Sequence, residues 1–205
     1  MTDNAESYSE VPSEILKHYK EVHLDIDVMY INRIPFLMAI SKSIGMIYCT
    51  PVMNKDDKRV SDTLTSIISQ CNGQGFRVVT IYGDGTFESL KNWAMNTHQV
   101  QITVCGAEGC VPQSENTIKF IKEQVQCIQC HMLFKRLPHL VTIEMMLRAV
   151  TLINLFHCKG NVHSVLSARE IVERRCFITP MCHFGNLVMA YNTKTSNDTG
   201  TERAV

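Results

Sequence analysis

Apolar and polar residues alternate near the N-terminus of the chain. In VHLDIDVMYI, residues 22–31, large apolar side chains take every second position from Val22 to Tyr30, while Asp25 and Asp27 fall between them. A period of two predicts a β-strand that buries one face and carries both acids on the other. A short helix is expected just before this strand, over about residues 12–20.

Two more strands are predicted directly after the first. Asn32-Arg33 has the composition of a tight turn, and the apolar runs IPFLMAIS (residues 34–41) and IGMIYCTPV (residues 44–52) follow it closely. Strands separated by so few residues pair most simply with their chain neighbours. The pattern therefore predicts an antiparallel three-stranded meander.

The hydrophobic period then changes from two to about 3.6. A helix is predicted by apolar residues at steps of three and four, namely Val60, Leu64, Ile67, Ile68 and Cys71, and Asn72-Gly73-Gln74-Gly75 should end it. The next segment, FRVVTIY at residues 76–82, is apolar on both faces. That composition predicts a central strand, parallel to a neighbour.

The second half of the chain alternates a short helix, a strand and two long helices. The short helix is expected around residues 87–94, the strand at VQITVC (residues 100–105), and the long helices at about residues 114–133 and 141–157. This order predicts an α/β fold whose mixed central sheet has three antiparallel strands, then parallel ones, between flanking helices. We expect a lead segment at 1–21, a core at 22–160 and an extension at 161–205, disordered from about 193 where the composition is polar and repetitive.

Composition narrows the functional classes. The formal net charge of zero excludes a global basic field, so nucleic acid would have to bind a local patch. Nine cysteines without an export-like N-terminus favour free thiols in the cytoplasm or nucleus rather than secretion. The most apolar long run, residues 140–156, contains Glu144 and Arg148, so no membrane span is expected.

Two acids should meet at one end of the predicted sheet. Asp27 lies in the first strand, and Asp84 follows the fourth strand between Gly83 and Gly85. If these strands are parallel neighbours, the two carboxylates converge, which makes sense chiefly if cations such as Mg²⁺ lie between them. The glycines would then give the strand a sharp exit and leave room for a cation and a phosphate. Asp84 as a turn residue and Asp25 as the first acid are the alternatives.

A third acid begins the first long helix. Glu115 lies at the border of the apolar stripe, and Lys119 and Lys122 follow on its own face. A carboxylate with two lysines one and two turns away suits a surface that holds a metal and a phosphate backbone. The simpler interpretation of the two lysines is a solvated helix face.

These residues resemble the integrase core of copia-type retrotransposon polyproteins, which has the ribonuclease H-like fold of the retroviral integrase superfamily. The similar segments are LDIDVMYINRIPFLMAIS, VVTIYGDGTFESL and VPQSENTIKFIKEQVQCI, and the resemblance covers about residues 12–190. Matched motif to motif, the catalytic acids are Asp27, Asp84 and Glu115. Lys119 and Lys122 take the offsets of the DNA-contacting lysines, and the loop at 105–114 is similar to the mobile loop before that helix.

The resemblance implies an Asp-Asp-Glu triad that holds Mg²⁺ or Mn²⁺, two ions when DNA is bound. It also implies 3′-end processing and strand transfer on retroelement and target DNA, and pairing into a homodimer. The chain departs from the family in the short interval of thirty residues between Asp84 and Glu115 and in the Ser-Glu-Asn around the third acid. Glu123 would lengthen that interval but lies two turns further along the helix.

Two further functional hypotheses remain beside the integrase. One is a truncated, catalytically degenerate transposon remnant that only binds nucleic acid or protein, which the zero net charge and short interval favour. The other is a nuclease of the same fold that cuts without joining ends.

Four cysteines also form a loose metal-binding pattern. Cys105, Cys110, Cys127 and Cys130 follow the spacing Cys-x4-Cys-x16-Cys-x2-Cys, which departs from the usual zinc ribbons. Buried or incidental thiols are the simpler interpretation.

Overall fold

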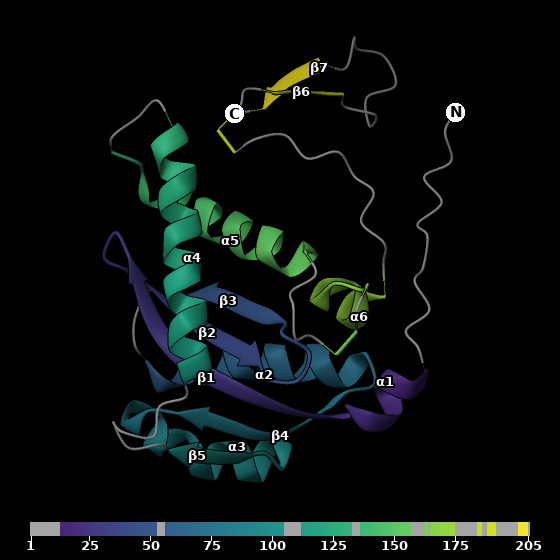
Figure 1. The fold of residues 1–205 in the computed structure, drawn as a ribbon. Helices are drawn as coiled ribbons and strands as arrows, with labels where there is room; N and C mark the ends of the chain where they lie inside the picture. The colour runs from purple at the N-terminus through teal and green to yellow at the C-terminus, as the bar shows by residue number, and fades with distance from the viewer. Residues whose placement is uncertain are drawn as a thin grey trace.

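A five-stranded mixed sheet forms the centre of the described part of the chain (Figure 1). The computed structural model describes residues 13–52, 56–104, 112–132, 136–156, 162–163, 165–174, 184–185, 188–191 and 201–204. The strands lie in the order β3-β2-β1-β4-β5, with bounds β1 (Glu21–Ile31), β2 (Ile34–Ser41), β3 (Ile47–Pro51), β4 (Arg77–Gly83) and β5 (Gln101–Val104). The first three pair antiparallel, whereas β4 pairs parallel with β1 and β5. The predicted mixed sheet is therefore confirmed.

The turn between β1 and β2 is the tight one that the sequence predicts. Asn32 and Arg33 both have positive φ, 48° and 67°. Two consecutive residues of positive φ are typical of the hairpin turn whose twist matches the flanking strands. β3 begins later than expected, at Ile47, because the chain first turns through Gly45, whose φ is 76°.

Helices cover both faces of this sheet. In chain order they are α1 (Ser13–His18), α2 (Asp57–Gly73), the 3₁₀ helix η1 (Gly85–Leu90), α3 (Lys91–His98), α4 (Pro112–His131), α5 (His139–Leu155) and α6 (Ala168–Glu173). The side chain of Asp56 caps α2, and α4 begins at Pro112, a residue suited to the first turn of a helix. α6 was not among the predicted helices, although a capping box between Ser167 and Glu170 marks its start.

Two apolar cores result, one on each side of the sheet. Val22, Leu24 and Ile26 of β1 face the core shared with α1, α2, α3 and α6. Met29 and Ile31 belong to the opposite core, with α4 and α5. Figure 1 shows α4 crossing the strands on one side while α2 and α3 lie on the other. The alternation seen in the sequence thus assigns each side of β1 to a separate core.

A side chain from α5 completes the outer edge of β3. The amide of Asn154 is buried, with 4% of its surface exposed, and it accepts from the backbone N–H of Ile47 at 3.0 Å. It also donates to the carbonyl oxygen of Ile47 at 2.7 Å. Both backbone groups at this point of the edge are therefore satisfied by a helix.

The C-terminal region contains a separate pair of strands. β6 (Val188–Tyr191) pairs antiparallel with β7 (Thr201–Ala204). β7 lies in the tail that composition predicts to be disordered, so this part of the prediction is wrong for Thr201–Ala204. A polar segment can still form a strand, because the hydrogen bonds between strands join backbone groups and do not require apolar side chains. Residues 192–200 lie outside the described residues. Among the helices that the structure describes, none combines the length and apolar character that crossing a bilayer requires.

Candidate functional site

Acidic side chains interrupt the apolar surface of the sheet on the side covered by α4. Asp25 and Asp27 alternate with Leu24 and Ile26 and so share the face of Met29, which belongs to the α4 core. In the parallel pairing of β1 with β4, Asp25 lies opposite Tyr82. The two strands run in the same direction. Asp27 comes two residues after Asp25, and Asp84 comes two residues after Tyr82, so the two acids continue the same pair of neighbouring chains.

Electrostatic interactions show that three of the predicted acids lie near one another. Burial raises the pKa of Asp27 above its usual range, and the negative charges of Asp84 and Glu115 raise it further. A hydrogen bond from the backbone N–H of Val28 at 2.6 Å and the positive charge of Lys122 act in the opposite direction. We call Asp27, Asp84 and Glu115 the acid cluster. Residues far apart in the sequence are thus brought together from β1, the end of β4 and α4.

Asp84 also has a local structural role. It is the N-cap of η1, and its Oδ1 accepts hydrogen bonds from the backbone N–H of Thr86 at 3.0 Å and from the hydroxyl of the same residue. The turn chemistry that the sequence offers as an alternative is therefore present. Since only Oδ1 makes these contacts, capping and membership of the acid cluster are compatible.

The two glycines beside Asp84 differ in what surrounds them. A Cβ at Gly83 would lie 2.7 Å from Cδ2 of Phe87 and 3.0 Å from Cγ1 of Ile26. Gly83 thus makes room for apolar packing on the α2 side of the sheet rather than for a cation. Gly85 faces open space. Neither residue has a positive φ, so the expected sharp exit does not come from a left-handed glycine conformation.

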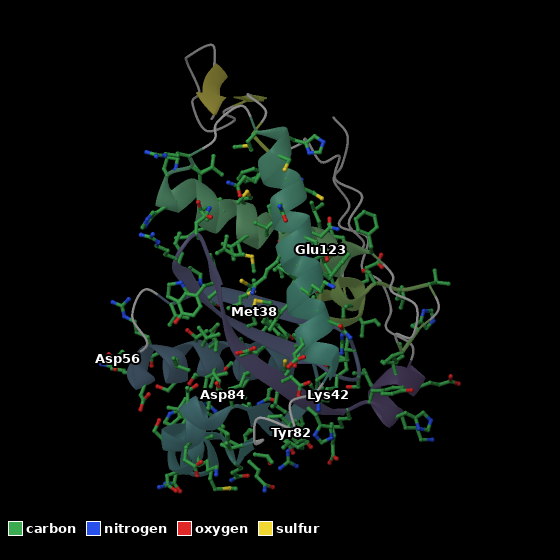
Figure 2. All side chains as sticks on the ribbon, turned by 60° about the vertical axis from the view of Figure 1, so that its left-hand side comes forward. Met38, Lys42, Asp56, Tyr82, Asp84 and Glu123 are labelled. Carbon is green, nitrogen blue, oxygen red and sulfur yellow. The ribbon has the colours of Figure 1, made fainter. Side chains whose placement is uncertain are left out.

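The third acid and the two predicted lysines lie on α4. Glu115 lies in the first turn of that helix, where the helix dipole favours a negative charge. Glu115, Lys119 and Lys122 are all exposed, and Lys122 is near enough to act on Asp27. Figure 2 places Glu123 well up α4, whereas Asp84 lies near the foot of that helix. The position of Glu123 supports Glu115 as the partner of the two aspartates.

Asp25, the alternative first acid, has a different environment. It is 5% exposed, and the ammonium of Lys42 lies 3.0 Å from its Oδ1. Burial raises the pKa of Asp25, and the hydrogen bond and charge of Lys42 oppose that rise. Asp25 therefore has an internal counter-ion, whereas Asp27 faces two further acids. This difference favours Asp27 as the residue available to a metal.

The chemistry of the acid cluster fits a hard divalent cation. Carboxylate oxygens are suitable ligands for Mg²⁺ or Mn²⁺, and a cation would offset both the burial of the Asp27 charge and its repulsion by Asp84 and Glu115, which together raise the pKa of Asp27. As arranged here, no three His, Cys, Asp or Glu side chains of the described residues stand close enough to hold one ion. The cluster is thus an assembly of candidate ligands rather than a closed metal cage.

The predicted cysteine array has a mixed outcome. Cys127 and Cys130 are exposed on α4 as free thiols. Cys105 and Cys110 lie outside the described residues, as does most of the loop that the resemblance compares with a mobile loop. Zinc binding by this array therefore stays a prediction.

The sequence-based interpretation missed two residues beside the acid cluster, Lys42 and Tyr82. The Lys42 ammonium lies 4.1 Å from the centre of the Tyr82 ring, and both residues lie with Asp84 near the foot of α4 (Figure 2). The period of two in β4, which gives Tyr82 the face of Asp84, could have indicated the tyrosine. Lys42 follows the last residue of β2, and only the fold places it over β1 and β4.

The sheet order and the flanking helices define a ribonuclease H-like fold with an acidic rim. No protein-family model and no curated protein matches the chain. Among solved structures it is similar to the HTLV-2 integrase catalytic core domain in complex with magnesium, in a trimeric form, with 12% identity and a TM-score of 0.52. The match covers 74% of this chain and 95% of that one. It is also similar to the catalytic core domain of BIV integrase, with 14% identity, a TM-score of 0.51, and 74% and 93% of the two chains covered. The predicted fold is therefore confirmed as that of retroviral integrase cores.

Proposed function

We propose that this chain is an integrase catalytic core of the copia retrotransposon type, which performs metal-dependent 3′-end processing and strand transfer on DNA. The observation that carries the proposal is that the charges of Asp84 and Glu115 both act on Asp27, in a chain with the fold of integrase cores. Mg²⁺ or Mn²⁺ held by these carboxylates would polarise the phosphodiester and favour deprotonation of the attacking water or hydroxyl.

The residues of the chain have distinct roles in this proposal. The three carboxylates bind the ions, Asp27 and Asp84 from the sheet and Glu115 from the helix. Lys119 and Lys122 contact DNA phosphates along the exposed side of α4, so binding should weaken as salt rises. Retroelement ends and target DNA are the proposed partners, together with a second copy of the chain in a homodimer. The proposed location is the nucleus or cytoplasm.

A strand-transfer assay with Mg²⁺ or Mn²⁺ tests the catalytic part of the proposal. Asp84→Asn should reduce joined products to background, because a neutral amide cannot replace an anionic ligand. The matched control is Asp62→Asn, which removes an exposed carboxylate from α2 on the opposite side of the sheet and should keep wild-type activity. Equal product from wild type and Asp84→Asn would remove the catalytic claim.

Thermal unfolding gives a second readout that does not depend on catalysis. Mg²⁺ or Mn²⁺ should raise the melting temperature of the wild-type chain by binding the folded state, and should raise that of Asp27→Asn much less. Identical shifts in both proteins would place the ion elsewhere. The comparison uses ion concentrations at matched ionic strength, so that general charge screening is equal.

A second candidate function is a catalytically degenerate remnant that binds nucleic acid or protein. The use of Asp84 Oδ1 as a helix cap favours it, because such a residue has a structural reason to be present without catalysis. DNA binding without strand transfer would support this candidate. Cleavage without joining would instead indicate a nuclease of the same fold.

A further inference from the structure

A second charged group lies beside the acid cluster on the same face of the sheet. Asp25 and Tyr82 are paired across β1 and β4, and each is followed two residues later by a member of the cluster. Two residues of a strand span about 6.6 Å, so the two rows of side chains are immediate neighbours. Any ligand long enough to extend past the acid cluster along the strands would meet the row of Asp25 and Tyr82.

Lys42 is held over this row by three contacts. Its ammonium lies 3.0 Å from Asp25 Oδ1 and 4.1 Å from the centre of the Tyr82 ring. Its backbone N–H donates to the carbonyl oxygen of His23 at 3.1 Å, and the ring of His23 lies against that of Tyr82 at 6.2 Å. These contacts reduce the conformational freedom that a lysine would otherwise lose on binding a ligand.

The lysine nevertheless remains accessible. Its side chain is 28% exposed, whereas that of Asp25 is 6% exposed. An ammonium group has three donors, of which Asp25 occupies one direction and the ring face of Tyr82 another. Since the Lys42 side chain is partly exposed beside these two contacts, an anionic oxygen from solution can approach its ammonium.

A purely structural role explains this arrangement poorly. A partly buried ion pair gains little net stability, because desolvating both charges offsets their attraction. The other face of β1 carries Val22, Leu24 and Ile26, which pack in an apolar core. A charged pair kept next to the acid cluster is better explained by a ligand that passes over both.

We propose that Lys42 and Tyr82 form a subsite for the DNA backbone, in which Lys42 contacts the phosphate next to the one that lies at the acid cluster. Asp25 is the positioning residue that directs the ammonium, and Tyr82 supports it from below. This inference rests on the proposed function for the identity of the ligand. It extends the DNA surface from α4 to the end of β2.

Salt-dependent binding of a fluorescent DNA duplex to the full chain, without divalent ions, tests the subsite. The variant is Asp25→Asn/Lys42→Gln, which removes both charges with nearly isosteric amides and leaves no buried charge unpaired. Binding should weaken about tenfold at low salt, and the slope of log affinity against log salt should fall by about 0.9, the value for one lost phosphate contact. Asp25→Asn alone keeps the charge of the lysine, so the slope should stay at the wild-type value.

The matched control is Glu88→Gln/Lys91→Gln. This pair is also an ion pair, with 2.6 Å between its charged atoms, but it connects η1 with the start of α3, on the opposite side of the sheet. It should keep wild-type affinity and slope. A wild-type slope in Asp25→Asn/Lys42→Gln, or an equal loss in the control, would overturn the subsite.

Tyr82→Leu provides a test that leaves the ion pair in place, in case the double variant does not fold. Loss of the ring beneath the ammonium should weaken binding about threefold, and unchanged binding would overturn the inference. Failure of the wild-type chain to bind DNA would overturn it as well. DNA binding without strand transfer would overturn only the proposed activity.

Discussion

The two faces of the central sheet show how differently one strand can be used. On the α2 side, β1 contributes Val22, Leu24 and Ile26, which are at most 4% exposed. On the α4 side the same strand is apolar only near its C-terminal end, at Met29 and Ile31. Its middle carries Asp25 and Asp27, and Glu115 in the first turn of α4 acts on Asp27.

This contrast separates the part of the sheet that stabilises the fold from the part available for chemistry. The α2 side is continuous with α1, α3 and α6, so its core has no interruption along β1. On the α4 side, burial raises the pKa of Asp27, and the charges of Asp84 and Glu115 raise it further. Such an arrangement costs stability, and proteins retain that cost mainly at functional sites.

The largest effect is expected when an acid is placed on the α2 side of β1, in comparison with removal of an acid from the α4 side at the next residue. Ile26→Asp places an unpaired carboxylate in the closed core and should lower the free energy of unfolding by more than about 3 kcal/mol, a large share of the stability of a small domain. Asp27→Asn, one residue further, should leave the chain folded. Urea denaturation measures both, and a stable Ile26→Asp would contradict the contrast.

Removing one partner of the ion pair should have the next largest effect. Lys42→Ala leaves Asp25 buried without its cation and should cost up to about 3 kcal/mol, less than for a fully buried pair because Lys42 reaches solvent. Asp25→Asn/Lys42→Gln should cost much less. The same urea measurement compares them, and equal losses would show that packing rather than charge governs this row.

The glycines beside Asp84 give a sharper comparison over two residues. Gly83→Ala should destabilise the fold by about 1–3 kcal/mol, because its Cβ meets Phe87 and Ile26 in the α2 core. Gly85→Ala faces open space and should be nearly neutral. Thermal melts of both variants test this difference. A neutral Gly83→Ala would mean that Phe87 moves aside freely.

The smallest expected effect is the pH dependence caused by Asp27. Its folded-state pKa is raised, so the folded chain retains the proton more readily than the unfolded chain, whose aspartates have a pKa of about 3.9. Stability should therefore fall as pH rises from that value through the folded pKa. Asp27→Asn removes this loss, so the variant should exceed wild type at pH 7 and equal it near pH 3. A constant difference across that range would contradict the assigned environment.

Local patterns predicted most of the fold. The period of two in β1, the closely spaced strands and the helical steps of α2 and α4 gave the right elements, since each is set by which residues must be buried. α6 was not predicted from the sequence, because it is only six residues long and its surroundings lack a regular hydrophobic pattern. The helix expected near residues 87–94 is divided into η1 and α3, a detail that the capping by Asp84 decides.

The candidate site was predictable in part. The positions of the acids within β1, just past β4 and in the first turn of α4 follow from strand direction and helix order, and the structure brings the charges of Asp27, Asp84 and Glu115 together. Sequence spacing could not distinguish Asp25 from Asp27, because both share one face of the strand. The difference comes from Lys42, whose approach over Asp25 depends on the pairing of β2 with β1.

The hydrogen bonds between the Asn154 amide and the backbone of Ile47 on β3 affect how a second chain could pair with this sheet. An edge strand with unpaired backbone N–H and C=O groups can pair with a strand of another chain. Here the side chain of Asn154 on α5 makes hydrogen bonds with the backbone N–H and C=O of Ile47, as a neighbouring strand would. If two copies of the chain associate, a continuous sheet running from one copy into the next is therefore disfavoured at this point of the β3 edge.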